Sequence, residues 1–274
     1  MELLSNLQPS QASQIDKEFL QNPSILNGFR LYHNNKYLDI FTHDQKQYDD
    51  WKNALTYRCI QLNFHEEYQV FKMIGKGSFA KVYLATKKST PGSQFAIKAF
   101  NKEFMSTQHK GKESLINEIY IMRQLNSEHL LRLYEVYETS NSIYFVLDIV
   151  NGGELLNRVR EKGQMNQFQL INLMRNIMKA ISYLHSRNIM HRDLKPENLL
   201  LKNKESDGSD IVLADFGLAT KTDIENVIFK RCGTPGFVAP EVLLYKVSQK
   251  NIKKTFFFIL FFFKKKRMEN HYIV

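Results

Sequence analysis

The hydrophobic pattern of the chain changes in kind along its length, and this change constrains the possible folds most strongly. From Tyr68 onward, strand-like stretches are separated by glycines and turns, at residues 71–84, 95–100 and 143–149. A longer stretch over residues 170–184 then carries apolar side chains at helical spacing. A strand-rich part followed by a helical part predicts an α+β fold with two lobes and a cleft between them.

Length and composition exclude several classes of protein. With 274 residues, 43% of them hydrophobic, the chain can form one large or two ordinary globular domains and is not a disordered protein. The net charge of +10 arises largely from the last thirty residues, so it does not indicate nucleic-acid binding. Cys59 and Cys232 are far apart and indicate neither a disulfide framework nor a zinc site, so a reducing, cytoplasmic location fits best.

Neither end of the chain has the pattern of a membrane or export signal. The first fourteen residues lack a basic stretch followed by an apolar core, so we predict no secretory signal. The strongest apolar run, residues 256–263, is much shorter than the roughly 20 residues that a membrane span needs. We therefore predict no transmembrane helix.

The first sixty residues predict a small module of their own. Residues 1–27 are polar and show no clear period. Two alternating stretches, residues 29–32 and 37–41, are separated by four polar residues and predict a β-hairpin.

A helix is expected directly after this hairpin. Asp44 and Gln47 have the spacing of a capping box, and Tyr48, Trp51 and Leu55 fall on one face. Strands followed by an amphipathic helix with a central tryptophan resemble the last part of a pleckstrin-homology domain, over residues 28–62. An amphipathic extension packed on the next domain is the alternative, and no lipid-binding residue is assigned.

Residues 75–80, GKGSFA, form a glycine-rich turn whose backbone can approach phosphates closely because bulky side chains are absent. A dinucleotide-binding turn would open a helix, whereas residues 81–85 alternate like a strand. This context predicts a phosphate-binding lid between two strands. A tight hairpin without a ligand is the alternative reading of the turn taken alone.

The strand at residues 95–100 carries a second nucleotide signal. Ala96 and Lys98 share one strand face, so a small residue can flank a flat base while the ammonium group reaches phosphates. A buried lysine needs an anionic partner, and Glu118 on a helix predicted over residues 112–125 is the candidate. The apolar residues that would dock this helix are Leu115, Ile119 and Met122. The alternative makes Lys98 and Glu118 ordinary surface charges.

These motifs occur together with HRDLKPEN at residues 191–198, DFG at residues 215–217 and APE at residues 239–241. In this order, from residue 68 to residue 244, they resemble eukaryotic protein kinases. A chance occurrence of the HRDLKPEN and DFG motifs in this order is negligible. The resemblance implies a bilobal kinase fold and transfer of the ATP γ-phosphate to serine or threonine in proteins.

The resemblance also implies the catalytic roles. Asp193 would orient and deprotonate the substrate hydroxyl, and Lys195 would lie near the transferred phosphate. Asn198 and Asp215 would hold magnesium through hard oxygen ligands. The implied catalytic set is Lys98, Glu118, Asp193 and Lys195.

By the same resemblance, Leu147 is the gatekeeper, residues 148–150 form the hinge that binds adenine through its backbone, and Glu154 contacts the ribose. Ala80 replaces the third glycine of the lid, a departure that should stiffen the turn without abolishing it. The implied nucleotide-binding residues are Ile74, Gly75, Lys76, Gly77, Ser78, Val82, Ala96, Lys98, Leu147, Asp148, Val150, Glu154 and Leu200.

Finer features point to a branch of the family. Lys195 together with residues 233–235, GTP, resembles the serine/threonine branch, and residues 146–155 and 232–241 resemble the calcium/calmodulin-dependent kinase group. In related kinases, carboxylates at the positions of Glu154 and Glu197 face basic residues of the peptide substrate, which implies a basic consensus.

The activation segment departs from this group. Lys230 stands two residues before Cys232, where the group often carries a phosphorylatable threonine. Activation at this position is therefore in doubt, and Thr220 and Thr222 are the alternative sites.

The segment after Glu241 also departs from the pattern. Residues 246–274 are basic and rich in phenylalanine and contain no recognisable pillar helix for the C-lobe. We therefore expect a kinase domain over residues 68–245 with an incomplete C-lobe, and a catalytically impaired nucleotide-binding or interaction fragment is the alternative function. The basic and apolar tail also raises the alternatives of contact with a membrane lipid or with calmodulin.

Overall fold

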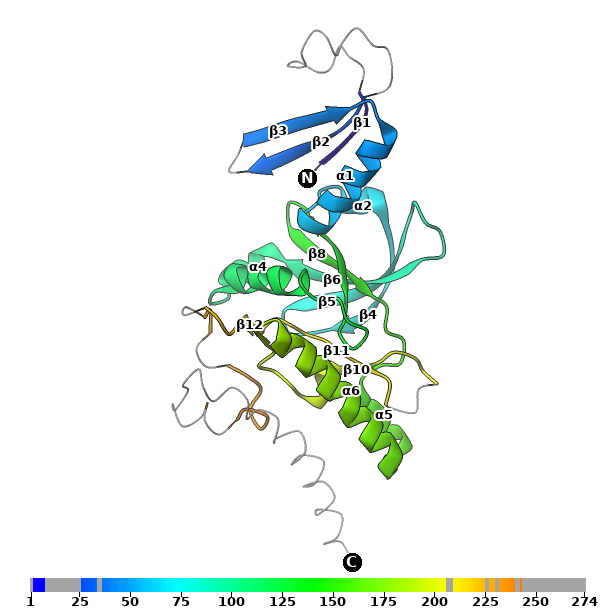
Figure 1. Ribbon diagram of the computed structural model, residues 1–274, viewed down its shortest axis with the longest axis vertical. Helices are drawn as coiled ribbons and strands as arrows, with labels where there is room; N and C mark the ends of the chain where they lie inside the picture. Colours follow the sequence, from blue (N-terminus) through cyan, green and yellow to red (C-terminus); the bar gives the residue numbers. More distant parts are fainter. Residues whose placement is uncertain are drawn as a thin grey trace, which may run out of the picture. The chain divides into compact units, whose positions relative to one another are not determined.

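The fold was analysed in a computed structural model (Figure 1), which describes residues 2–7, 26–33, 36–205, 209–224, 227–229, 232–239 and 242. The chain divides into two compact units. Unit 1 comprises Met1–Met105 and Leu133–Asp148, and unit 2 comprises Ser106–Arg132 and Ile149–Val274. The predicted sites at Lys230 and Glu241 and the tail at residues 246–274 lie outside the described residues.

Unit 1 begins with a three-stranded antiparallel sheet, drawn in blue in Figure 1. Its strands are β1 (Glu2–Leu7), β2 (Leu26–His33) and β3 (Lys36–Thr42), in the order β1-β2-β3. The predicted hairpin is confirmed, and β1 lies within residues 1–27, where the sequence shows no periodicity. Arg30 on β2 forms an ion pair of 2.7 Å with Asp39, its direct cross-strand partner on β3.

Helix α1 (Gln45–Arg58) follows the sheet as expected. The Asp44 carboxylate accepts hydrogen bonds from the amides of Lys46 and Gln47 and so caps the first turn. The predicted capping box is wrong in its second half, because the Gln47 side chain accepts a hydrogen bond from Thr42 instead of returning to the cap.

Only part of the predicted apolar face of α1 is buried. Tyr48 is buried and stacks on Phe29 of the sheet, with 4.8 Å between ring centroids, and Leu55 packs beside them. Trp51, which was predicted to lie on the same face, is 47% exposed. The small core here is already filled by the stacked Phe29 and Tyr48 rings, so the neighbouring turn of the helix remains at the surface.

The segment after α1 packs into the next sheet of unit 1. The Gln61 amide donates to the Val136 carbonyl and the Gln61 carbonyl accepts from Glu138, both at 2.8 Å, so the segment lies parallel to the edge strand β7 (Leu133–Glu138). Helix α2 (Phe64–Glu67) then places Phe64 fully inside the core. Its ring stacks on Tyr144 at 4.1 Å.

A five-stranded antiparallel sheet forms the rest of unit 1. Its strands are β4 (Tyr68–Lys76), β5 (Ala80–Lys87), β6 (Gln94–Asn101), β8 (Ser142–Asp148) and β7, in the order β4-β5-β6-β8-β7. The strands predicted over residues 71–84, 95–100 and 143–149 are confirmed. A short helix, α3 (Lys102–Thr107), follows β6, and the Asn101 side chain caps it by accepting a hydrogen bond from the Phe104 amide at 2.8 Å.

Unit 2 is built around helices. These are α4 (Gly111–Met122), α5 (Leu155–Lys162) and α6 (Gln167–Ser186). Its short strands form two antiparallel pairs, β10 (Leu199–Leu201) with β11 (Ile211–Leu213) and β9 (Ile189–Met190) with β12 (Thr220–Lys221). A capping box between Asn166 and Gln169 starts α6, whose buried side chains are Leu173, Ile177, Ala180, Ile181 and Leu184.

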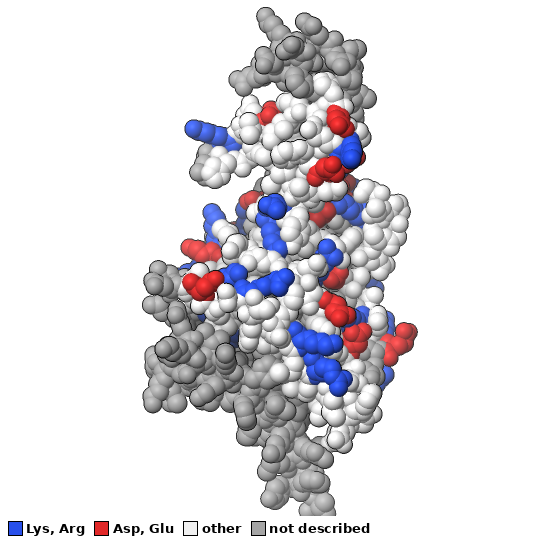
Figure 2. Space-filling model, viewed as in Figure 1, with Lys and Arg blue, Asp and Glu red and all other residues white. Residues whose placement is uncertain are grey.

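The predicted α+β fold, with strands first and helices later, is thus confirmed. Within the described residues, no helix is both long and apolar enough to cross a membrane. On the face seen in Figure 2, lysine and arginine side chains are interspersed with aspartate and glutamate instead of forming one continuous basic surface.

Candidate active site

The HRDLKPEN segment occupies the turn between β9 and β10, and its last residues form the short 3₁₀ helix η3 (Pro196–Asn198). Strand β11 pairs with β10 and leads directly into the DFG segment. A hydrogen bond of 2.8 Å from the Ala214 amide to the Asn198 carbonyl joins the two segments. Two motifs that are seventeen residues apart in the sequence therefore lie side by side in unit 2.

His191 connects the two segments through its ring. Its ring is buried, its Nε2 lies 3.0 Å from the Ala214 carbonyl, and its Nδ1 lies 3.3 Å from the Asp193 amide. Burial lowers the pKa of His191. A neutral ring that donates through Nε2 and accepts through Nδ1 satisfies both contacts. Phe216 packs edge-on against this ring, with 5.1 Å between centroids.

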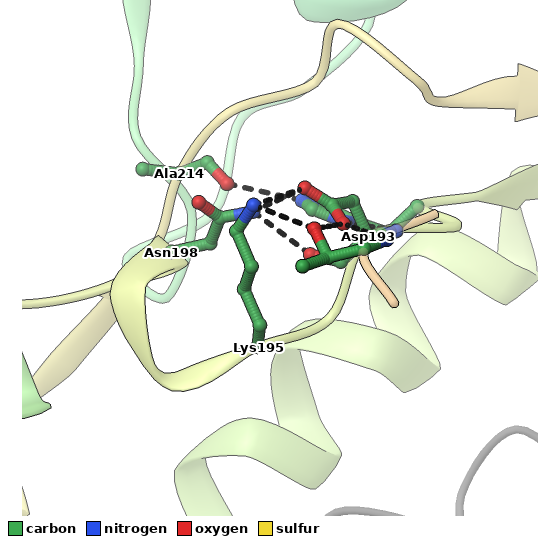
Figure 3. A network of polar contacts seen from close by, with 6 residues as sticks. Asp193, Lys195, Asn198 and Ala214 are labelled. Atoms are coloured by element: carbon green, nitrogen blue, oxygen red, sulfur yellow. Dashed lines mark hydrogen bonds and ion pairs between the residues drawn. The ribbon is translucent and has the colours of Figure 1, made fainter. Parts of the chain in front are cut away.

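Asp193 is the centre of the polar network in Figure 3. Its Oδ1 accepts from the Thr234 amide at 3.0 Å and from the Thr234 hydroxyl at 2.6 Å. Its Oδ2 accepts from Lys195 Nζ at 2.8 Å and from Asn198 Nδ2 at 3.2 Å. Burial alone would raise the pKa of Asp193, but the hydrogen bonds from Lys195, Thr234 and Asn198 outweigh it and hold the pKa below its usual value. The carboxylate is therefore charged at neutral pH.

Asn198 and Asp215 offer oxygen atoms near this network. The Asn198 side-chain nitrogen donates to both the carbonyl and the carboxylate of Asp193, so the amide oxygen points away from Asp193 (Figure 3). Asp215 has a left-handed backbone, with φ of 64°, and its side chain is exposed between the buried residues Ala214 and Phe216.

The donor set fits magnesium better than a transition metal. Within the described residues, no group of three or more histidine, cysteine, aspartate or glutamate side chains is arranged to hold a metal ion. The side chains of Asn198 and Asp215 offer hard oxygen atoms. Magnesium is typically held by one or two such protein ligands together with phosphates and water.

Helix α4 brings Glu118 to the same part of unit 2. Ser114 donates to the Gly217 carbonyl at 3.1 Å and Asn117 donates to the Ala219 carbonyl at 2.8 Å, which docks the helix on the DFG segment. Glu118 is buried. A Cβ atom on Gly217 would lie within 3.6 Å of carboxylate oxygens of both Asp215 and Glu118. The turn at Gly217 therefore lies close to both carboxylates.

Unit 1 holds four of the residues that were predicted to bind the nucleotide. Val82 on β5 is the direct cross-strand partner of Lys98 on β6, and Ala96 on β6 is the partner of Leu147 on β8. Direct partners share a sheet face, so all four side chains lie on one side of the five-stranded sheet. The turn of the glycine-rich lid is closed by a 2.8 Å hydrogen bond from the Gly77 amide to the Ala80 carbonyl.

The remaining predicted nucleotide residues divide between the units. Ile74 is exposed on β4, next to the lid residues, and Asp148 ends β8, where its carboxylate accepts a hydrogen bond from Tyr134 at 2.6 Å. Val150, Glu154 and Leu200 belong to unit 2. Glu154 forms an antiparallel bridge with Leu200, which fixes these two predicted contacts beside each other.

Comparison with known proteins agrees with this geometry. The model of the family "Protein kinase domain" matches residues 68–255, which is more than half of the chain. The chain belongs to the protein kinase family. The match extends past the predicted domain boundary at residue 245.

Curated relatives of this kinase chain are also kinases. Calcium/calmodulin-dependent protein kinase type 1 of Caenorhabditis briggsae is 42% identical over 185 residues, which cover 67% of this chain and 50% of the relative. The protein of the same name from Caenorhabditis elegans is 42% identical over 182 residues, covering 66% and 51%. Myosin light chain kinase A of Dictyostelium discoideum is 40% identical over 176 residues, covering 64% and 58%.

The chain spans about half the length of these two calcium/calmodulin-dependent kinases. It is similar to serine/threonine kinases of the calcium/calmodulin-dependent group, as the sequence predicted. The family match begins at residue 68, so the resemblance of residues 28–62 to a pleckstrin-homology domain stays a prediction.

Two functional contacts of the kinase domain were not expected from the sequence. The sequence singles out Thr234 only as part of the GTP segment of the serine/threonine branch. Its hydroxyl donates to the Asp193 carboxylate and accepts a 2.8 Å hydrogen bond from Lys195. Arg192 donates through Nε to the Leu218 carbonyl at 2.7 Å and through Nη1 to the Phe229 carbonyl. Both contacts connect the HRDLKPEN segment to residues that follow it by more than twenty positions, which no local pattern reveals.

Arg192 differs in its environment from a surface arginine. Burial lowers the pKa of its guanidinium group, and its backbone is left-handed, with φ of 66°. Its donors are used by backbone carbonyls of the activation segment. The arginine therefore positions that segment relative to Asp193, its neighbour in the chain.

Proposed function

We propose that this chain transfers the γ-phosphate of ATP to serine or threonine residues of protein substrates. The observation that carries the proposal is the charged Asp193 carboxylate, held by Lys195, Asn198 and Thr234 in one hydrogen-bonded network. Phosphoryl transfer depends on positioning and on charge neutralisation more than on covalent chemistry, and this network can supply both.

In the proposed reaction, Asp193 accepts a hydrogen bond from the substrate hydroxyl and takes its proton as the oxygen attacks phosphorus. Its low pKa makes it a weak base, which suits a late proton transfer and an orienting role. Lys195, bound to the same carboxylate, provides positive charge next to the attacking oxygen.

The proposed metal ligands are the amide oxygen of Asn198 and the carboxylate of Asp215. Bound magnesium would neutralise charge on the phosphate oxygens. Asn198 is held by its two hydrogen bonds to Asp193, so its oxygen keeps a fixed direction. The protein kinase family generally uses ATP with magnesium, and the oxygen-only donor set supports the same pair here.

The proposed adenine site uses the shared face of Val82, Ala96 and Leu147, with the backbone of Asp148 and Val150 as hydrogen-bonding groups. Lys98, on the same face, is assigned to the phosphates, with Glu118 as the carboxylate that orients it. The small side chain of Ala96 supports this assignment because it leaves space for a flat ring.

We assign substrates with basic residues near the phosphorylated serine or threonine. Glu197 supports this preference because its Oε2 atom has no hydrogen-bond partner among the described residues. Glu154 contributes a second carboxylate, which contacts only the Asn157 amide group at 3.5 Å within the described part of the chain. Carboxylates with spare acceptor capacity can pair with arginine or lysine of a peptide.

The test is a phosphorylation assay with a synthetic serine peptide that carries arginines before the serine. Asp193→Asn should lower the rate by about 10²-fold or more, because the proton acceptor is lost while the shape is kept. A peptide with the arginines replaced by alanine should be a poorer substrate. Equal incorporation by the wild type and Asp193→Asn would overturn the proposal, and ATP binding without incorporation by either form would favour the nonenzymatic alternative.

A further inference from the structure

The five-stranded sheet of unit 1 has a second face, opposite to the face that carries Val82 and Lys98. Residues on this second face alternate with the nucleotide residues along each strand. One row crosses four strands through direct partners, from Lys76 on β4 to Lys81 on β5, Ala99 on β6 and Tyr144 on β8. None of these four side chains belongs to the polar network around Asp193.

This row lies in a groove of about 630 Å³. Ala99 forms the floor of the groove because it is the small member of the row, between larger neighbours. The residues that line the groove include Lys76, Lys81, Tyr83, Ala99, Phe104 and Tyr144. Tyr83 lies beside Ala99 on the floor of the groove, because it pairs with Ile97, which shares a sheet face with Ala99 on β6.

The walls of the groove are aromatic. Phe104 on α3 lies near Phe79 at the tip of the lid, with 6.3 Å between ring centroids, and both rings are more than 40% exposed. On another side, Tyr144 is stacked on Phe64 and touched edge-on by His65. An apolar side chain placed over Ala99 would therefore meet aromatic rings on more than one side.

The charged side chains that line the groove are lysines. Lys76 and Lys81 are direct cross-strand partners, an arrangement in which like charges repel. Neither lysine forms an ion pair or side-chain hydrogen bond with a described residue, and both are exposed. No described residue that lines the groove is acidic. A bound anion would remove the repulsion between the two ammonium groups.

We propose that this groove binds a partner protein through a short acidic segment that carries an aromatic side chain. The aromatic side chain occupies the hollow over Ala99, between Tyr83 and Tyr144. Acidic residues next to it pair with Lys81 and Lys76. A peptide fits these features better than a simple anion, because the groove combines a charged rim with an apolar floor.

This interaction is separate from the proposed phosphoryl transfer, so its test needs no activity. The probe is a fluorescein-labelled synthetic peptide with a phenylalanine centre flanked by aspartates, and binding to the full chain is measured by fluorescence anisotropy. Lys81→Glu reverses one charge of the rim, and Ala99→Trp fills the hollow. Each change should weaken binding by about tenfold or more.

Matched controls separate this site from general electrostatics. Lys112→Glu makes the same charge change at an exposed position of α4 and should leave binding unchanged. Lys81→Arg should retain most of the affinity, and a peptide with lysines in place of aspartates should prefer Lys81→Glu over the wild type. Thermal unfolding of each variant checks that Ala99→Trp is folded. Lys81→Glu tests the site independently of this question, because Lys81 is exposed and its replacement does not disturb the core.

Two results would overturn the proposal. One is equal affinity of the wild type, Lys81→Glu and Ala99→Trp for the peptide. The other is equal affinity of the wild type for a peptide whose phenylalanines are replaced by serine, which would reduce the site to a basic surface. Phosphatidylserine vesicles are tested in parallel, and stronger Lys81-dependent binding to vesicles than to the peptide would assign the groove to a membrane instead.

Discussion

Asp193 illustrates how a buried carboxylate stays charged in this protein. Burial of an unpaired carboxylate is costly, and most such groups bind a proton instead. Here, four donor contacts from Thr234, Lys195 and Asn198 compensate for the lost water, and the pKa falls below its usual value. The charge of Asp193 therefore depends on a residue forty-one positions later in the chain.

Replacement of Thr234 tests this dependence. Thr234→Ala removes the hydroxyl that donates to Asp193 at 2.6 Å, so the pKa of Asp193 should rise. On the proposed mechanism, the acid limb of the kcat profile should move to higher pH, and kcat at neutral pH should fall by about tenfold. Thr234→Ser keeps the hydroxyl and serves as the control. A profile identical in all three proteins would show that the hydroxyl does not act on Asp193.

Burial of His191 makes the stability of the protein depend on pH. Its pKa is lowered in the folded state because the ring is buried, whereas an unfolded chain has the ordinary value of 6.5. Between these two values the unfolded state binds more protons, so acid favours unfolding. The free energy of unfolding should therefore decrease as the pH falls below about 6.5.

Urea unfolding at several pH values between about 8 and about 5 measures this effect. His191→Gln, whose side chain does not titrate, should be less stable at neutral pH but should lose less stability on acidification. A steeper acid dependence in His191→Gln than in the wild type would contradict the prediction.

At the scale of elements, the segment between α1 and β4 is part of the kinase sheet and not a loose connection. It bridges β7 through Gln61 and inserts Phe64 into the core formed by Tyr68, Ile97, Tyr137 and Val146. The family match starts only at residue 68, after this segment. The elements that precede the family domain therefore contribute directly to the packing of its first lobe.

Phe64→Ala should destabilise the protein by about 3–5 kcal/mol, because the ring is fully buried and stacked on Tyr144. Phe71→Ala is the matched control, since Phe71 on β4 is 54% exposed and should change the free energy of unfolding by about 0.5 kcal/mol or less. Denaturant unfolding of both variants measures the difference. Similar stability of the two variants would mean that the segment is not packed as described.

The elements also separate what the sequence can predict from what it cannot. The sequence predicts strands β4, β5, β6 and β8 from alternating apolar residues, and it predicts α6 from its apolar stripe. An element that buries one face carries apolar residues at a regular spacing. Strand β1 is defined by its pairing with β2, which leaves no such period. Helix α3 is short and depends on the Asn101 cap, and Trp51 stays exposed because the small core beneath α1 is already filled.

The same distinction applies to the site. Asp193, Lys195 and Asn198 can be found because they are contiguous in one motif, and their shared network follows from a single turn of chain. The contact of Thr234 with Asp193 and of Arg192 with Phe229 arises only after the chain folds back. Long-range contacts of this kind have no local signal in a single sequence.

For the whole molecule, the proposed nucleotide ligands are distributed over both units. Lys98 belongs to unit 1, whereas Asn198 and Asp215 belong to unit 2. A ligand that binds only the folded protein raises the free energy of unfolding by RT ln(1 + [L]/Kd). This increase is about 2.7 kcal/mol when the ligand is at 100 times its Kd. Stabilisation by ATP and magnesium is thus a measure of binding that does not require phosphoryl transfer.

Differential scanning calorimetry of the full chain with millimolar ATP and magnesium should show a higher Tm than without them. Lys98→Ala in one unit and Asp215→Asn in the other should each remove most of this increase, because each deletes a charge assigned to the phosphates or to the metal. Lys112→Ala, an exposed lysine on α4, should retain the full increase. If the increase survived in both Lys98→Ala and Asp215→Asn, ATP would bind elsewhere on the protein, and the roles assigned to these two residues would have to be abandoned.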